Sequence, residues 1–266
     1  MSTAQMRLPA NGTPKNEILK AMKALRLSDV QWRKGKAFSL VYHAGEEISD
    51  LLKQAYELFF SENGLNPTAF PSLRKFETEV VAMSAALLGG DESVVGNMTS
   101  GGTESILMAV KTARQWGRAH KPKVDAPEMV LPESAHPAFE KAAHYFGVKP
   151  VRTTLRPDFR ADVEAVREAI TPASILLVAS APSYPHGVVD PIQELAETSR
   201  ENGLLFHVDA CVGGFMLPFI RRLGYSVPEF DFHVPGVTSI SADLHSAASS
   251  RNQKRKVACH CGIIQD

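Results

Sequence analysis

The sequence predicts an α/β protein built around a largely parallel sheet, and three observations support this fold class. Short apolar runs with strand character alternate with helical segments between residues 93 and 241, which is the pattern of successive βαβ units. A glycine-rich turn, Ser100-Gly101-Gly102-Thr103, joins one expected strand to the next helix. The composition, 44% hydrophobic and 22% charged over 266 residues, is ordinary for a globular domain with a substantial core.

Two amphipathic helices are expected before the alternating region. The first begins near residue 46 and has one apolar face, formed by Ile48, Leu51, Leu52, Ala55, Leu58 and Phe59. The second ends at Gly89-Gly90 and has a similar face, formed by Leu73, Phe76, Val80, Met83 and Leu87.

The alternating region then contributes the sheet and its covering helices. Strands are expected near Ser93–Val95, Met129–Leu131, Pro150–Thr153, Ile175–Ser180, Leu204–Val208 and Val237–Ser241. Helices are expected at about 105–118, 137–146, 161–170 and 191–202.

We expect three segments along the chain. Residues 1–45 form an N-terminal arm, and residues 46–245 form the large domain. Residues 246–266 read SAASSRNQKRKVACHCGIIQD, in which apolar residues are scarce until the end. Such a stretch buries too little surface to order itself, so we expect a disordered tail rather than another element of the sheet.

Charge and cysteine content narrow the class of function. The 29 Lys and Arg residues balance 29 Asp and Glu residues, so no net field favours nucleic acid or an anionic membrane. No apolar run approaches the roughly 20 residues of a membrane span, and the first residues lack the hydrophobic core of a secretory signal. Three cysteines are an odd and sparse set, which indicates a reducing compartment. The sequence therefore predicts a cytoplasmic protein whose partner is a small molecule or a protein.

The strongest local motif is Thr99-Ser100-Gly101-Gly102-Thr103-Glu104, between a strand and a helix. Glycines at such a turn aim backbone N–H groups at an anion, and the helix N-terminus adds a partial positive charge. The motif lacks the spacing of a nucleotide P-loop and of a dinucleotide-binding fingerprint. Phosphate binding is one interpretation; a simple turn with Ser100 or Thr103 as helix N-cap is the other.

A second candidate is Asp209, at the end of the strand Phe206-His207-Val208-Asp209-Ala210. Ligands of parallel sheets bind at the carboxyl ends of strands, so this carboxylate points to the expected cleft. It could hold a cationic ring nitrogen, or it could cap the following turn. Gly213-Gly214 would then allow the backbone to approach closely.

Histidines supply further candidates. His136 follows an expected strand, where an imidazole could stack on a flat cofactor or transfer a proton. His207 and His245 flank strand ends and rank above the remaining histidines. Cys259-His260-Cys261 lacks a second pair of ligands at zinc-finger spacing, so no metal site is expected.

These segments together closely resemble the sphingosine-1-phosphate lyases, within the wider group II decarboxylase family that depends on pyridoxal 5′-phosphate (PLP). The resemblance covers about residues 35–245. It rests on several motifs in order, namely Phe70–Arg74, Asn97–Ala109, Ser134–His136, Pro185–Val188, His207–Phe215 and Gly236–Asp243.

The resemblance implies a PLP fold-type I large domain and a role for each matching residue. Ser100, Gly101, Gly102 and Thr103 would hold the cofactor phosphate, and His136 would stack on the pyridine ring. Asp209 would pair with the protonated ring nitrogen, which keeps the cofactor an effective electron sink. His207 and His245 would also contact the cofactor, His245 near its phosphate.

One expected residue is absent. The family reads Asp-x-His-Lys where this chain reads Asp243-Leu244-His245-Ser246. Serine cannot take the place of the lysine, because a Schiff base needs a primary amine. The resemblance stops at His245, so we expect a truncated or frame-shifted product without the family's C-terminal small domain.

The resemblance further implies a homodimer and a PLP-dependent carbon–carbon lyase. Its substrate would be a phosphorylated long-chain base, cleaved by a retro-aldol reaction to an aldehyde and phosphoethanolamine. This chain would itself be inactive for want of the lysine. Amino-acid decarboxylation on the same apparatus remains an alternative, as does a non-catalytic PLP-binding relic.

Overall fold

The structure is a computed structural model that describes residues 11–37, 41, 43–244 and 260–264, the last five by their backbone alone. The chain divides into two units, residues 1–43 and 44–266, which are treated separately. The first contains helix α1 (Lys15–Leu25) and two 3-10 turns, Arg26–Ser28 and Trp32–Lys34. None of these elements has a buried residue.

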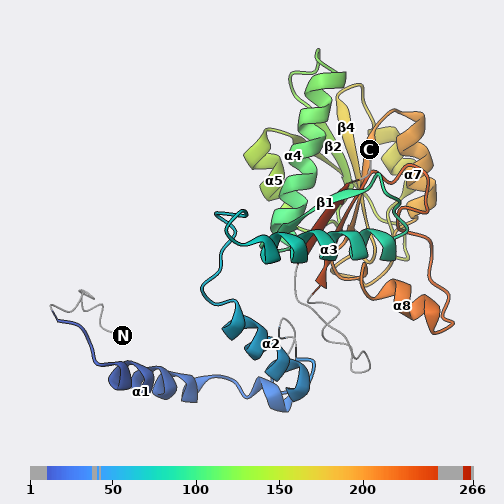
Figure 1. The fold of residues 1–266 in the computed structure, drawn as a ribbon. Coiled ribbons are helices and arrows are strands. Elements are labelled where there is room, and N and C mark those ends of the chain that lie inside the picture. The colour runs from blue at the N-terminus through green and yellow to red at the C-terminus, as the bar shows by residue number, and fades with distance from the viewer. Residues whose placement is uncertain (1–10, 38–40, 42, 245–259, 265–266) are drawn as a thin grey trace, which may run out of the picture. The chain divides into compact units, whose positions relative to one another are not determined.

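The second unit is built on a seven-stranded sheet with the order β1-β7-β6-β5-β4-β2-β3 (Figure 1). Its strands are β1 (Val95–Thr99), β2 (Glu128–Pro132), β3 (Lys149–Thr153), β4 (Ser174–Ser180), β5 (Leu205–Ala210), β6 (Ser239–Asp243) and β7 (His260–Ile264). Neighbours from β3 to β6 pair in parallel, and β7 is antiparallel to both β6 and β1. The predicted α/β class with a mainly parallel sheet is confirmed.

Helices cover both faces of this sheet, as the sequence pattern requires. The helices of this unit are α2 (Glu46–Leu58), α3 (Pro71–Leu87), α4 (Gly102–His120), α5 (Ala138–Phe146), α6 (Val163–Ala169), α7 (Ile192–Glu201) and α8 (Leu217–Arg222). Of these, α3 to α7 contact the strands. Figure 1 shows α4 and α5 on one side of the strands and α7 on the other. The helices expected at 105–118, 137–146, 161–170 and 191–202 are thus present as α4 to α7.

Two apolar clusters hold the layers together, one on each face. The first joins Phe206, Val208 and Ala210 of β5 to residues of α6 and α7, such as Val166 and Leu195. The second joins strand residues such as Leu131 and Val178 to α4 and α5 residues such as Ile106 and Phe139. Since side chains alternate along a strand, His207 and Asp209 point away from the first cluster, toward the α4 and α5 side.

Three local expectations need correction. The strand expected near Ser93–Val95 begins at Val95 and runs on to Thr99, so it leads directly into the glycine-rich turn. Helix α8 was not expected, because its six residues are too few to show a period. Residues 260–264 form β7, although the tail was not expected to add a strand. Strands β1 and β6 each have backbone N–H and C=O groups that need partners on the side facing β7. The extended segment that ends in Ile263-Ile264 pairs with both strands.

Helix α2 forms where the apolar period predicts it, but its apolar face is not buried against other described residues. Leu51, Leu52 and Leu58 are exposed, and α2 has no buried residue. Just after α2, Phe59 meets Phe76 of α3 edge-to-face, with ring centroids 5.4 Å apart. In the part of the chain that the structure describes, no helix is both long and apolar enough to cross a membrane.

Candidate functional site

The start of α4 presents backbone donors that no side chain caps. Gly101 is the N-cap residue and makes no side-chain capping hydrogen bond. The interpretation of Ser100 or Thr103 as an N-cap is therefore wrong. The first N–H groups of a helix lack intrahelical acceptors, and here both flanking hydroxyl residues, Ser100 and Thr103, are exposed. These donors and the helix dipole suit a phosphate.

One acidic side chain already interacts with this turn. Glu104 Oε2 accepts a hydrogen bond of 2.6 Å from the Ser100 backbone N–H. Donation from Ser100 lowers the pKa of Glu104, so this carboxylate is charged at neutral pH. Thr99 lies behind the turn, where its Oγ1 is 2.8 Å from Ser105 Oγ. Hydrogen bonds of Thr99 and Glu104 thus support the turn, while the first backbone N–H groups of α4 have no side-chain cap.

Asp209 is held firmly at the end of β5. It is only 8% exposed. Its Oδ1 accepts from the Cys211 backbone N–H at 3.2 Å and from Ser241 Oγ at 3.1 Å. Both of these bonds end on Oδ1, and the Cys211 side chain also interacts with the Asp209 carboxylate. Each carboxylate oxygen has two lone pairs, so Oδ2 has capacity to accept from a ligand N–H.

Close packing brings the α4 turn and the end of β5 together. A Cβ at Gly102 would lie 3.0 Å from Cys211 Sγ, two residues beyond Asp209. Burial of this sulfur raises the pKa of the Cys211 thiol, so it stays protonated. A Cβ at Gly213 would lie 2.1 Å from the Ala181 carbonyl oxygen, so only glycine allows the turn after β5 to approach the end of β4. The close approach predicted at Gly213 is confirmed.

His207 lies deeper on the same face as Asp209 and is 1% exposed. Its Nδ1 is 2.8 Å from Ser239 Oγ, and its Nε2 is 3.2 Å from Ser241 Oγ. Burial lowers the pKa of His207 to about 4, with a smaller opposing effect from Asp209, so the ring is neutral at pH 7. Both ring nitrogens of His207 therefore have serine partners within the chain, and the expected contact of His207 with the cofactor stays a prediction.

His136 lies at the carboxyl edge of the sheet, after β2. Its Nδ1 accepts from the Ala138 backbone N–H at 3.1 Å, which leaves Nε2 and the ring face for other contacts. Tyr184, from the loop after β4, meets the His136 ring edge-to-face with centroids 5.5 Å apart. The nearby residues Ser134 and Ser183 have buried hydroxyl oxygens with no hydrogen-bond partner among the described residues. Each of these buried hydroxyls needs a partner outside the described residues, such as water, an ion or a ligand.

Sequence reasoning missed Ser239, Ser241 and Tyr184. The two serines alternate along β6, and the register pairs His207 with Ser239 and Asp209 with Ser241. That alternation was visible in the sequence, but its meaning depends on the register between the two strands. His245 and Ser246 lie outside the described residues, so their predicted roles have no structural account.

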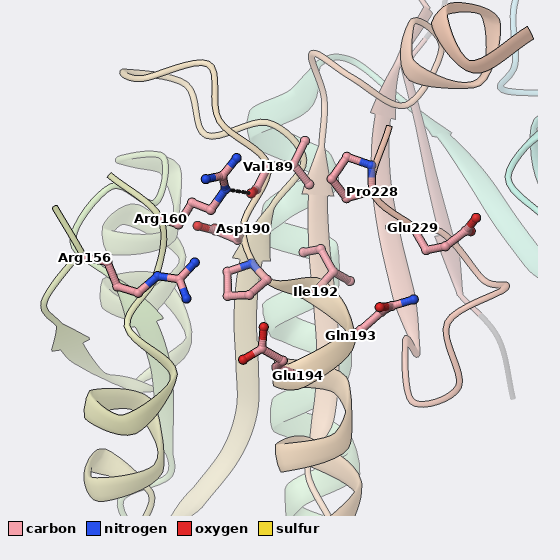
Figure 2. A pocket seen from close by; sticks show the side chains of 10 residues that line it. Arg156, Arg160, Val189, Asp190, Ile192, Gln193, Glu194, Pro228 and Glu229 are labelled. Carbon is pink, nitrogen blue, oxygen red and sulfur yellow. Dashed lines mark hydrogen bonds between the residues drawn. The ribbon is translucent and has the colours of Figure 1, made fainter. Parts of the chain in front are cut away.

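A separate pocket of about 260 Å³ opens at the start of α7 (Figure 2). It is lined by Arg156, Arg160, Val189, Asp190, Pro191, Ile192, Gln193, Glu194, Pro228 and Glu229. Arg160 Nε donates to the Val189 carbonyl at 2.9 Å, and its Nη1 pairs with Asp158 at 2.7 Å. The buried Asp190 carboxylate accepts from the backbone N–H groups of Ala161 and Ser180. These groups brace the loops after β3 and β4, and none of the candidate site residues lines this pocket.

Glu229, Asp231 and His233 also gather, with one potential metal-ligand atom of each within 4.8 Å of the others. Two of the three are already paired, because His233 Nδ1 lies 2.8 Å from Asp231 Oδ1. Glu229 lies 3.5 Å from Arg221. We assign no metal to this cluster.

The arrangement defines a class of protein: an α/β domain that places a glycine-rich helix start without a side-chain cap beside a buried carboxylate at one edge of its sheet. Residues 1–249 match the model of the pyridoxal-dependent decarboxylase conserved domain. The chain belongs to this family, and the predicted membership is confirmed.

Two relatives and one solved structure show where in the family the similarity is strong. The chain is 48% identical to the sphingosine-1-phosphate lyase of Arabidopsis thaliana over 237 residues, which is 86% of this chain and 43% of that protein. It is 48% identical to sphingosine-1-phosphate lyase 1 of Rattus norvegicus over 239 residues, 90% of this chain and 42% of that protein. The structure of the Burkholderia pseudomallei sphingosine-1-phosphate lyase superposes with a TM-score of 0.90 at 36% identity, over 99% of this chain and 61% of that one. The chain thus spans less than half the length of these two curated relatives.

Proposed function

We propose that the site binds PLP and is of the sphingosine-1-phosphate lyase type. One observation carries the proposal: the uncapped start of α4 lies against Cys211, two residues from the buried Asp209 carboxylate, whose Oδ1 is fixed by two hydrogen bonds. A planar ligand with a phosphate at one end and a protonated ring nitrogen at the other matches these two features. The likeness to named lyases supports the same assignment.

Each part of the site has a task in this proposal. The N–H groups at the start of α4, with the Ser100 and Thr103 hydroxyls, bind the phosphate. Asp209 Oδ2 accepts from the ring N–H and holds that proton in place, while His136 covers a ring face. When bound, PLP supplies an electron sink for a pair of electrons released from a breaking bond to carbon.

The chain as it reads carries Ser246 where the family has its lysine. We therefore expect PLP to be held noncovalently and expect no lyase turnover from this chain. The substrate class of the intact site would be a phosphorylated long-chain base. We further propose a cytoplasmic homodimer, for which the exposed apolar residues of α1, such as Leu25, offer a contact surface.

A PLP titration followed by absorbance, with pyridoxal as the probe that lacks a phosphate, tests this proposal. We expect saturable binding of PLP, weaker binding of pyridoxal, and no lysine adduct by mass spectrometry after borohydride reduction. Absence of PLP binding would overturn the proposal. A reduced adduct on a lysine would show that another amine substitutes for the missing one.

The alternative, an amino-acid decarboxylase site, is favoured only by the wider family to which the chain belongs. The lyase and decarboxylase assignments are separated by adding each type of amine substrate in turn to the PLP-loaded chain. A phosphorylated long-chain base should change the PLP absorbance at lower concentration than aspartate or glutamate does. The reverse order would favour the decarboxylase.

A further inference from the structure

Four buried side chains on β5 and β6 form a continuous line of hydrogen bonds that ends on Asp209. Ser239 Oγ lies 2.8 Å from His207 Nδ1, His207 Nε2 lies 3.2 Å from Ser241 Oγ, and Ser241 Oγ lies 3.1 Å from Asp209 Oδ1. All four residues are at most 8% exposed. The parallel register, with Ser239 opposite His207 and Ser241 opposite Asp209, sets this spacing.

Counting hydrogens gives the line a direction. A carboxylate only accepts, so Ser241 must use its single hydroxyl hydrogen to donate to Asp209. Ser241 Oγ can then only accept from His207, so Nε2 must carry the ring proton. A neutral imidazole carries one proton, so Nδ1 is bare and accepts from Ser239 Oγ. Phe139 of α5 meets the ring edge-to-face, with centroids 5.9 Å apart.

We propose that His207 is a positioning residue: through Ser241 it fixes Asp209 Oδ1, so that Oδ2 is aimed at the ring nitrogen of the ligand. Ser239 donates to Nδ1 and so satisfies the bare nitrogen of the tautomer that Asp209 and Ser241 require. In the opposite tautomer Nε2 would carry no proton and would have to accept from the Ser241 hydroxyl. Ser241 would then have no hydrogen left to donate to Asp209. This inference rests on the proposed PLP site and adds three residues, His207, Ser239 and Ser241, that act on the ligand only through Asp209.

The first test needs no cofactor. In the full chain with ¹⁵N-labelled histidine, two-bond ¹H–¹⁵N spectra report which ring nitrogen of His207 carries the proton. We expect the Nε2–H tautomer at pH 7. A His207 ring with the proton on Nδ1, or with both nitrogens protonated, overturns the proposal.

The second test uses PLP labelled with ¹⁵N at the ring nitrogen. Ser241→Ala should weaken PLP binding about tenfold, because a hydrogen bond to a charged group is lost. It should also shift the ring-nitrogen resonance toward the unprotonated position. Ser199→Ala is the matched control, since Ser199 is also buried but donates to the Ala196 carbonyl on α7. His207→Gln, whose amide can still donate to Ser241, should retain more affinity than His207→Leu.

The outcomes separate the two proposals. Unchanged affinity and an unchanged ring-nitrogen resonance in Ser241→Ala overturn the positioning role while PLP binding stands. If neither the unmodified chain nor Ser199→Ala binds PLP, the proposed function fails, and the positioning role of His207 fails with it. If His207→Leu does not fold, Ser241→Ala and the tautomer spectrum still decide the matter.

Discussion

The two ends of the candidate site differ in how completely the chain prepares them. The end at Asp209, which we propose holds the ligand ring and call the ring end, is buried and hydrogen-bonded through Ser241 to His207. The end at Ser100 and Thr103, which we propose holds the phosphate and call the phosphate end, is exposed, and α4 begins there without a side-chain cap. In the part of the chain that the structure describes, Glu104 is the side chain that accepts from a backbone N–H of this turn.

This difference follows from where each end sits in the fold. Asp209 ends a central strand, so its surroundings are fixed by the packing and register of β5 and β6. The turn before α4 packs against Cys211 at Gly102, and local hydrogen bonds from Thr99 and to Glu104 support it, but its hydroxyl side chains remain exposed. A preorganised carboxylate loses little freedom on binding, whereas exposed hydroxyls must be ordered by the ligand. Substitutions at the ring end should therefore have the larger effects.

Asp209→Asn should have the largest effect on the ligand. Removing the charge leaves the protonated ring nitrogen without a counter-ion in a buried place, so PLP should bind about 100-fold more weakly. Fluorescence or absorbance titration measures this. Asp158→Asn, at an exposed aspartate, is the control and should bind as the unmodified chain does. Equal affinities for the two variants would remove Asp209 from the site.

Acid should destabilise the ring end through His207. Burial lowers the pKa of His207 to about 4 from 6.5, so the unfolded chain takes up this proton first as the pH falls. Stability from the neutral ring is fully present above pH 6.5 and is lost between there and about pH 4, by about 3 kcal/mol. Urea unfolding at pH 7 and pH 4 should show a smaller loss for His207→Gln than for the unmodified chain. Identical losses would contradict a buried neutral His207.

At the phosphate end, Thr103→Ala should weaken PLP binding only about fivefold, the effect of one hydrogen bond of about 1 kcal/mol. Pyridoxal has no phosphate, so its affinity should not change. Titrating both ligands against both chains measures the difference. An equal loss for pyridoxal would mean that Thr103 does not act on the phosphate.

Glu104→Gln should have the smallest effect and the opposite sign. The Glu104 carboxylate is held charged by the Ser100 N–H, which a phosphate would also use. Removing the charge should tighten PLP binding about twofold at pH 7, since exposed charges interact weakly. The gain should disappear for pyridoxal. Weaker PLP binding in this variant would show that Glu104 supports the turn rather than competing at it.

Much of the fold could be predicted because its elements carry strong local patterns. The strands of the central sheet are short apolar runs separated by helices, and β4 is buried along its whole length. Helix α8 and strand β7 were missed because neither has a period of its own. The pairing of β7 depends on the strands beside it, which no local window contains.

The site was only partly predictable for a related reason. Asp209 and the α4 turn could be singled out as candidates because each stands at the end of a strand, where ligands of parallel sheets bind. The hydrogen-bond partners of His207 could not be predicted, because the sequence shows its place on the strand but not the serines that lie opposite it on β6. Tyr184 reaches His136 across a loop, a contact that no sequence spacing indicates.

A crystal structure of the full chain soaked with PLP would test the central claim most directly. We predict the ring nitrogen at about 2.8 Å from Asp209 Oδ2 and the phosphate on the first N–H groups of α4. We also predict that His136 covers the ring. A phosphate bound elsewhere, or a ring nitrogen turned away from Asp209, would contradict the account.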